Sequence, residues 1–229
     1  MAQFTFDYLY LYTVGAIVGI VLTLATMAGS IAIGLFGALG RLSGHRTVRA
    51  LASAYVALFR GVPPLVLLYI IYFGLPTWAH DLGIGFLVDL LSPLNNRLLA
   101  AVVAFAANSG AYSTEIIRAS IESIPGEQAE AARSLGMSYG LAMRRVILPQ
   151  AMRVAFAPLG NEFITVLKGT SLASVIGVTE LMRDAQLAAA ATFKNLMAYS
   201  LAAIFYVIMV IILQYIVTSV EKRFTFAHS

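Results

Sequence analysis

The stretch Tyr8 to Gly40 reads YLYLYTVGAIVGIVLTLATMAGSIAIGLFGALG and carries no charged residue. A helix of about 20 apolar residues crosses the hydrocarbon core of a bilayer, so this run is long enough to span one. It is far longer than the apolar part of a cleavable signal peptide, and no basic segment precedes it. The stretch therefore predicts a first membrane-spanning helix that remains part of the protein.

The rest of the chain has the composition of a membrane protein. Of its 229 residues, 60% are hydrophobic and 11% are charged, whereas about 25% are charged in a typical soluble domain. No internal repeat or low-complexity linker divides it, so we expect a single transmembrane domain over residues 1–229. Its fold class is predicted to be all-α, a polytopic helical bundle of five spans in which four further apolar runs follow the first: Gly61 to Ala79, Leu98 to Thr114, Val154 to Ile176 and Asn195 to Val220.

Basic residues predict the orientation of this bundle, because Lys and Arg in short loops are retained on the cytoplasmic side. With an external N-terminus, the external segments hold Arg97, Arg183 and Lys194, and the cytoplasmic ones hold Arg41, Arg46, Arg49, Arg118, Arg133, Arg144, Arg145, Arg153, Lys222 and Arg223. We therefore expect an external N-terminus and a cytoplasmic C-terminus. The net charge of +4 then needs no nucleic-acid partner. The absence of cysteine excludes disulfides and thiolate metal sites.

The longest predicted cytoplasmic segment, Ser120 to Arg153, differs from the spans around it. Pro125 and Gly126 form a turn that opens a helix, acidic residues follow in its first turn, and Pro149 is expected to end it. Small residues recur at three- and four-residue spacing, which predicts a face that another protein can approach closely; they are Ala129, Ala132, Gly136 and Gly140.

Within this segment the triplet Glu130-Ala131-Ala132 is followed by Gly136 and then by Val146-Ile147-Leu148-Pro149. These residues resemble the EAA loop of bacterial ABC-importer permeases, which docks in a cleft of the cytoplasmic ATPase subunit. We interpret Gly136 as a point of close backbone approach, or alternatively as a helix break or C-cap. The resemblance implies that the ATPase-docking residues are Glu130, Ala131, Ala132, Arg133, Gly136, Leu148 and Pro149.

Other motifs extend the likeness over roughly residues 10 to 220: Phe59-Arg60-Gly61-Val62-Pro63-Pro64-Leu65, Asn108-Ser109-Gly110-Ala111-Tyr112, Pro158-Leu159-Gly160-Asn161 and Leu167-Lys168-Gly169-Thr170-Ser171-Leu172. They are similar to the polar amino-acid subfamily of these permeases. The resemblance implies a type I importer subunit that translocates polar amino acids, or close analogues such as opines. Transport would cross the bacterial inner membrane by alternating access.

The resemblance also implies partners: a dimeric ABC ATPase, a second permease chain that is identical or homologous, and a periplasmic or lipid-anchored solute-binding protein. No Gly-x-x-x-x-Gly-Lys-Ser/Thr phosphate loop occurs in the chain, so ATP and Mg²⁺ are expected on the ATPase. We expect no cofactor, metal or catalytic residue in this chain. The sequence leaves homodimer and heterodimer equally open.

Polar residues inside the predicted spans are costly and are therefore candidates for the substrate pathway. An alternative interpretation is that they hydrogen-bond neighbouring spans, with Glu115 paired to Arg118. The candidates are Arg60, Asn108, Tyr112, Glu115, Asn161, Glu162, Lys168, Thr170 and Ser171.

A bound amino acid needs a cationic or amide-rich site for its carboxylate and an acceptor for its ammonium. Lys168, near an expected helix break, is the leading cation, and Glu162 and Glu115 are the available acceptors. Arg60 competes with Lys168, because the Pro63-Pro64 pair next to it interrupts a helix and starts another whose amides point at the break.

Two other classes of function fit the sequence less well. An ion channel would need a run of filter carbonyls or a ring of charged side chains, and none is evident. An intramembrane enzyme would need a nucleophile beside a base or a set of metal ligands, yet His45, His80 and His228 are scattered along the chain.

Overall fold

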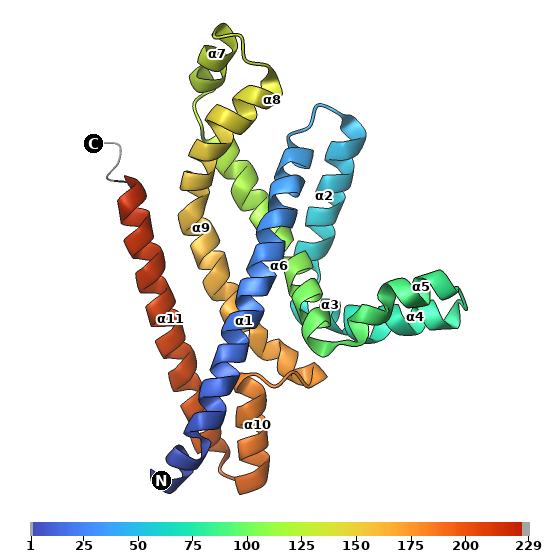
Figure 1. Ribbon diagram of the computed structural model, residues 1–229, viewed down its shortest axis with the longest axis vertical. Helices are drawn as coiled ribbons and strands as arrows, with labels where there is room; N and C mark the ends of the chain where they lie inside the picture. The colour runs from blue at the N-terminus through green and yellow to red at the C-terminus, as the bar shows by residue number, and fades with distance from the viewer. Residues whose placement is uncertain (1, 226–229) are drawn as a thin grey trace.

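The computed structural model describes residues 2–225, with side chains described for residues 8–222; His228 lies outside the described residues. Throughout the described part the regular structure is helical and no strand occurs, which confirms the all-α prediction. The elements in chain order (Figure 1) are α1 (Ala2–Arg41), α2 (Arg46–Gly61), α3 (Pro64–Tyr69), the π-helical turn η1 (Ile70–Gly74), α4 (Leu75–Asp81), α5 (Gly85–Leu91), the 3-10 turn η2 (Ser92–Asn95), α6 (Arg97–Glu122), α7 (Gly126–Ser134), α8 (Tyr139–Ala142), the π-helical turn η3 (Met143–Ile147), α9 (Leu148–Gly169), the 3-10 turn η4 (Thr170–Ile176), α10 (Leu181–Thr192) and α11 (Asn195–Thr225).

Two described helices are long and apolar enough to cross a bilayer alone: Tyr8–Arg41 in α1 and Asn195–Lys222 in α11. Three bent helix pairs pass the same test together and raise the number of spans to five if each pair counts as one. The pairs are Arg46–Gly61 with Pro64–Asp81, Gly85–Asn95 with Arg97–Glu122, and Tyr139–Ile176 with Leu181–Thr192.

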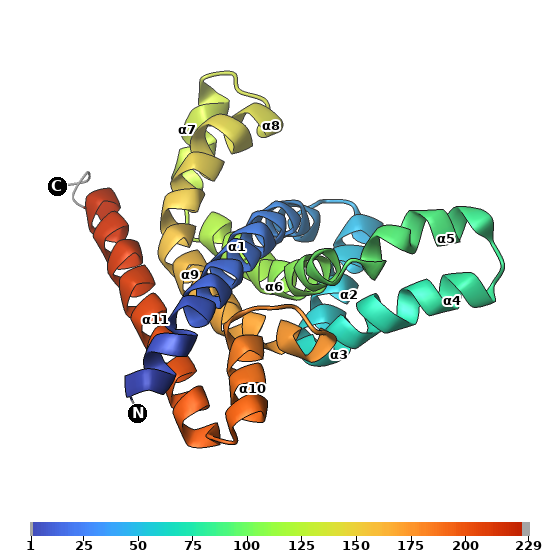
Figure 2. The same cartoon turned by 60° about the horizontal axis from the view of Figure 1, so that its bottom comes forward.

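Helices α1 and α6 form the centre of the bundle, with α2 against one side of them and α9 against another (Figures 1 and 2). Small residues bring the two central helices together. A side chain on Gly34 of α1 would place its Cβ 2.6 Å from that of Ser113 on α6, so only glycine allows this approach. Such small-residue contacts are typical of helix packing in membranes, where the interior gains nothing from burying apolar surface away from lipid.

The helix break predicted at the Pro63-Pro64 pair is confirmed, and it lies at the start of the apolar run Gly61 to Ala79. Helix α2 ends at Gly61, Val62 and Pro63 are extended, and the axis turns by 103° before α3 and α4 continue. The cause is the proline pair, because neither Pro63 nor Pro64 can donate to the carbonyl four residues earlier. After the break the apolar run continues as α3, η1 and α4 and leaves the bundle in a lateral hairpin with α5 (Figure 2).

The prediction that Pro149 ends the cytoplasmic helix is wrong. Pro149 is the second residue of α9, a position where its missing N–H is tolerated, and helix continues from Tyr139 through η3 into α9. The helix of this segment ends instead near Gly136, which has a φ of +80°. The small residues expected on one face are therefore divided between α7 and α8.

Candidate functional site

A cavity of about 370 Å³ opens where α3 begins, between α6 and α9. Apolar side chains and backbone make much of its wall, and a few polar groups from α6 and α9 converge on it, which is the usual character of a small-molecule site. The lining residues are Pro64, Phe105, Asn108, Ser109, Tyr112, Glu162, Thr165, Val166 and Gly169.

The proline break shapes the first wall. In an unbroken helix the Phe59 carbonyl would accept from the N–H of residue 63, but Pro63 has none. Asn108 of α6 supplies the missing donor, because its Nδ2 lies 2.6 Å from the Phe59 oxygen. The amide of Asn108 therefore holds the end of α2 against α6 while the same side chain lines the cavity.

A positive charge stands beside the cavity. Arg60, in the last turn of α2, places its guanidinium carbon 4.9 Å from the centroid of the Tyr112 ring. A guanidinium over an aromatic face is attracted by the ring's negative charge distribution, so Tyr112 orients Arg60. Arg60 remains exposed, which leaves its donors available to another group.

A negative charge lies on the opposite element, α9. Glu162 accepts a hydrogen bond of 2.7 Å from the Ser109 hydroxyl. Ser109 in turn accepts from Ser30 of α1 at 2.9 Å, and Ser30 lies 2.8 Å from the hydroxyl of Ser113. Each hydroxyl has one proton to donate, so with Ser30 donating to Ser109 the proton between Ser30 and Ser113 comes from Ser113.

The three serines are nearly inaccessible: Ser30 and Ser113 are 0% exposed and Ser109 is 3% exposed. Their hydroxyls form a chain that points its donors toward the carboxylate. Hydrogen bonds in such a chain polarise one another and fix the orientation of the last acceptor. Three spans, α1, α6 and α9, are thereby joined at Glu162. The cavity can hold a molecule with an anionic end near Arg60 and a cationic end near Glu162.

Not all of the predicted pathway residues meet at this cavity. Asn108, Tyr112 and Glu162 line it, and Arg60 is tied to it through Tyr112. The remaining candidates, which are outside its lining, are Glu115, Asn161, Lys168, Thr170 and Ser171.

Glu115 lies instead in an ionic network toward the α7 end of the bundle. Its Oε1 is 3.5 Å from Nε of Arg41 on α1, and its Oε2 is 2.9 Å from a terminal nitrogen of Arg118. Arg118 also binds Glu122 at 2.6 Å. This arrangement matches the alternative interpretation of Glu115 as a partner of Arg118, and it adds a tie from α6 to the end of α1.

Two of the other candidates stabilise the break between α9 and η4. Thr170 and Ser171 donate to the carbonyls of Leu167 and Lys168, at 2.7 and 2.8 Å, in the short turns that end α9. The side chains of Lys168 and Asn161 are exposed. Arg60 lies over the ring of the lining residue Tyr112, whereas Lys168 is exposed outside the lining, so Arg60 is the better candidate for a cation at the cavity.

Sequence reasoning missed Ser109, Ser30 and Thr165. Ser109 directly follows Asn108 in the same polar motif of a predicted span, and this position is the signal that could have identified it. Ser30 looks like any other small residue of the first span. Its contact with Ser109, 79 residues away, depends on how α1 and α6 pack.

A second candidate region is the segment from α7 to η3. Helix α7 ends in a Schellman arrangement: the N–H of Met137 donates to the Ala132 carbonyl at 3.1 Å, and Gly136 adopts the left-handed conformation that this closure requires. The interpretation of Gly136 as a C-cap is therefore confirmed. No atom lies within 4 Å of the position its Cβ would take.

The predicted docking residues are divided between surface and interior. Glu130, Ala131, Arg133 and Pro149 are exposed, Leu148 is half-buried, and Ala132 packs inward with 4% exposure. Beside them Leu135 and Tyr139 are 80% and 70% exposed. These two large apolar side chains are exposed on a segment that projects from the bundle (Figure 1). Exposed apolar surface of this kind is typical of a contact with another protein.

Within the described residues, no three His, Cys, Asp or Glu side chains come together in a way that would hold a metal ion. The polar groups that line the cavity are hydroxyls, an amide and a carboxylate, which can form hydrogen bonds and ion pairs.

Known proteins resemble this chain along nearly all of its length. The Glutamine transport system permease protein GlnP of Escherichia coli (strain K12) is 38% identical over 86% of this chain and 85% of its own length. The Arginine transport system permease protein ArtQ of Bacillus subtilis (strain 168) is 37% identical over 94% of this chain and 88% of its own.

Solved structures agree on the fold. A crystal structure of an amino acid ABC transporter with histidines matches with a TM-score of 0.82 and 36% identity over 96% of both chains. An inward-facing MetNI methionine ABC transporter matches with a TM-score of 0.76 at 19% identity, over 95% of this chain and 98% of that one, and supports the fold alone.

The family described as "Binding-protein-dependent transport system inner membrane component" matches residues 30–226, which include the cavity, the α7 segment and the last span. The relatives and the family match agree with the resemblance carried by the EAA triplet and the motifs of the spans. The chain therefore belongs to the family of binding-protein-dependent transport system inner membrane components.

Proposed function

We propose that this chain is the permease subunit of an ATP-binding-cassette importer for polar amino acids or close analogues, and that the cavity between α3, α6 and α9 is its translocation site. The observation that supports this most directly is the placement of Glu162 and Arg60 around one small cavity. A free amino acid is a zwitterion, so it requires two opposite charges at a short separation. The relatives named for glutamine, arginine and L-cystine transport belong to the same chemical class.

The substrate carboxylate would meet Arg60 and the Tyr112 hydroxyl, and its ammonium would meet Glu162 and Thr165. Burying a charged side chain at membrane depth costs free energy, so such a side chain is expected only where an opposite charge of the substrate or of the protein pairs with it. The apolar remainder of the wall, with Phe105 and Val166, would contact the side chain of the substrate.

The α7 segment is the proposed contact with a separate ATPase, which would bind ATP and Mg²⁺. In this scheme Glu130 and Arg133 make polar contacts and the left-handed Gly136 sets the angle between α7 and α8. Closure of the ATPase dimer would move α7, and the continuous helix from Tyr139 to Gly169 would carry that movement to Glu162. The N-terminus would be external and the C-terminus cytoplasmic, with a second permease chain and a solute-binding protein completing the importer.

The proposal is tested by uptake into proteoliposomes that contain the chain with its ATPase and binding protein. Radiolabelled glutamine, arginine, cystine and histidine are offered one at a time, with a sugar as the negative control. We expect ATP-dependent uptake of at least one amino acid and of no sugar. Glu162→Gln should reduce it at least about tenfold, the effect of roughly 1.4 kcal/mol.

The matched control is Asp89→Asn, which neutralises an exposed acid on α5 outside the cavity. Uptake in this variant should equal that of the unmodified chain. ATP-dependent uptake of the sugar alone would contradict the substrate class, and full amino-acid uptake by Glu162→Gln would contradict the site.

A further inference from the structure

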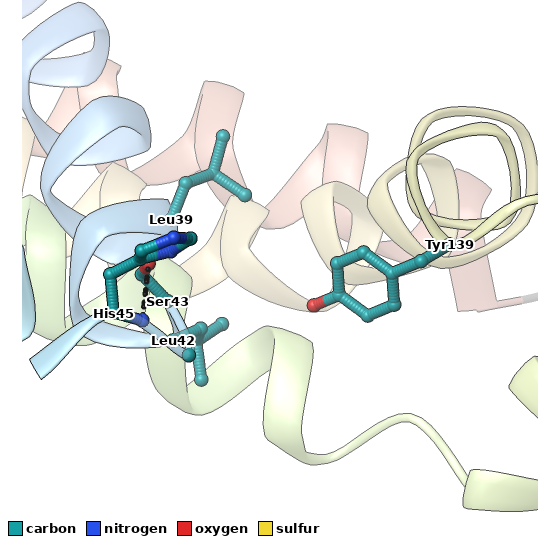
Figure 3. A pocket seen from close by; sticks show the side chains of 6 residues that line it. Leu39, Leu42, Ser43, His45 and Tyr139 are labelled. Carbon is teal, nitrogen blue, oxygen red and sulfur yellow. Dashed lines mark hydrogen bonds between the residues drawn. The ribbon is translucent and has the colours of Figure 1, made fainter.

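A second cavity, of about 480 Å³, lies at the α7 end of the bundle between the α1–α2 loop and α8 (Figure 3). One side is formed by the end of α1 and the loop, and Tyr139 faces them from across the opening with its hydroxyl directed toward the loop (Figure 3). The lining residues are Leu39, Leu42, Ser43, Gly44, His45 and Tyr139, and we call them the loop groove.

The loop groove lies where two helices leave the hydrocarbon of the membrane. The apolar span of α1 ends at Arg41, and α2 begins at Arg46. Leu39 therefore belongs to the end of a span, while Ser43 to His45 belong to the polar boundary. Helix α7 projects further along the long axis of the molecule than this loop (Figure 1). The groove thus sits at headgroup level, between the membrane and the proposed ATPase contact.

The charges around the loop groove are positive. Arg46 and Arg49 are exposed at the start of α2, directly after the lining residue His45, and no carboxylate is among the lining residues. The ion pairs found within the described residues involve Arg41 and Arg118, and neither Arg46 nor Arg49 takes part in one. The first turn of α2 also has no acidic residue, so two arginines stand at a helix end whose dipole disfavours them. Their proposed cytoplasmic position follows from the bias of basic residues, but no ion pair found among the described residues uses their charge.

We propose that the loop groove binds the headgroup of an anionic phospholipid. Its phosphate would be held by Arg46 and Arg49, with His45 and the Tyr139 hydroxyl as further donors, and the first carbons of its acyl chains would lie on Leu39 and Leu42. Basic pockets beside spanning helices on the cytoplasmic side are suited to anionic headgroups, and each Lys or Arg near the surface adds to the attraction. The inference uses the proposed orientation but is independent of the transported substrate.

Such a lipid would tie the α1–α2 loop to Tyr139, which belongs to the helix that continues into α9. The bilayer would then act on the same helix that carries Glu162. Anionic lipid is expected to alter ATP-driven transport through the groove without contacting the substrate.

The test uses the purified permease–ATPase complex in mild detergent, titrated with phosphatidylglycerol or with phosphatidylcholine and measured by native mass spectrometry. We expect saturable binding of phosphatidylglycerol and at least about tenfold weaker binding of phosphatidylcholine. The double variant Arg46→Gln/Arg49→Gln should lower phosphatidylglycerol affinity at least about tenfold. A second variant, Gly44→Leu, adds bulk at a lining residue and should do the same; it should be tolerated, because no atom lies within 4 Å of the added Cβ.

The charge-matched control is Arg153→Gln/Lys222→Gln, which removes two exposed positive charges from α9 and α11, helices other than the one that carries Arg46 and Arg49. This control should retain full affinity for phosphatidylglycerol. Equal losses in the control and the groove variants would overturn the proposal in favour of general surface charge. Unchanged lipid binding in the groove variants, with the ATPase no longer co-purifying, would overturn it in favour of a protein contact.

Discussion

The central cavity and the α7 segment satisfy their polar groups in opposite ways. Around the cavity, polar groups find hydrogen-bond partners within the chain. Asn108 donates a hydrogen bond to the Phe59 carbonyl, and a chain of three serine hydroxyls ends on the carboxylate of Glu162. On α7, Glu130 and Arg133 stay exposed and take part in none of the ion pairs found among the described residues. The cavity thus holds its polar groups in place without a ligand, whereas the α7 surface leaves polar groups exposed, as expected for the proposed contact with an ATPase.

The largest effect is expected on the α7 side, at Gly136. Gly136→Leu places a branched side chain in a left-handed conformation, which costs roughly 1–3 kcal/mol and would change the angle between α7 and α8. We expect ATP-dependent uptake to fall by more than about tenfold, while the chain remains inserted in the membrane. The measurement is uptake in proteoliposomes, with insertion checked by size-exclusion chromatography.

Two comparators identify the cause at Gly136. Gly136→Asn should retain most uptake, because asparagine tolerates the left-handed conformation. Gly140→Leu adds the same bulk nearby in open space at a residue without positive φ, and it should also transport. If Leu at 140 is as harmful as Leu at 136, crowding of the partner surface, and not backbone conformation, explains the loss.

On the cavity side the largest effect is expected at the cation. Arg60→Gln removes the guanidinium beside Tyr112 and should reduce uptake at least about tenfold. The carboxylate of the substrate would then lack a positive partner, which is costly at membrane depth. Lys168→Met should leave uptake within about twofold, because Lys168 is exposed and outside the cavity lining. Parallel uptake assays compare the two variants. Loss in Lys168→Met with normal transport in Arg60→Gln would exchange their roles.

A smaller effect, on stability, is expected at the proline break. Asn108→Ala leaves the Phe59 carbonyl without its donor and should destabilise the chain by about 1–3 kcal/mol. Pro63→Ala restores an N–H that this carbonyl can use, so the loss should shrink by roughly 1 kcal/mol in that background. A double-mutant cycle of unfolding free energies in detergent measures the coupling. Strict additivity would show that Asn108 does not compensate for the proline.

The smallest effect is expected at Ser30, which supports Glu162 without lining the cavity. Ser30→Ala removes the donor to Ser109 and should weaken substrate affinity about two- to fivefold, or roughly 0.5–1 kcal/mol. Thr23→Ala is the control, since Thr23 is equally buried on α1 but bonds its own helix at Gly19. Equal changes in both variants would assign the effect to packing of α1.

Hydropathy predicted the fold class, because crossing a bilayer forces long apolar helices whatever their partners. Hydropathy marked the run Gly61 to Ala79 but not the 103° angle that joins it to α2, since a hydropathy window records length and composition but not direction. The bend depends on two missing N–H groups at Pro63 and Pro64, which the sequence does display. Pro149 was misread because a continuing helix can accommodate a proline where a wider π-turn precedes it, as η3 does here.

The candidate site was predicted in part. Arg60, Asn108, Tyr112 and Glu162 stood out because polar residues are rare in spans, and the structure groups them at one cavity. The same rule also selected Glu115, which the structure ties to Arg41 and Arg118. Rarity alone cannot separate a ligand contact from a bond between helices. The serine chain was missed because its members meet only through the packing of α1 on α6.

The central claim, that the cavity between α3, α6 and α9 holds the substrate, is tested most directly by equilibrium binding. The permease–ATPase complex is solubilised without its binding protein and titrated with the radiolabelled amino acid that it transports. The account predicts saturable binding that Glu162→Gln weakens at least about tenfold, with complex assembly and basal ATP hydrolysis unchanged. Unchanged affinity in Glu162→Gln would contradict the account and place the substrate elsewhere.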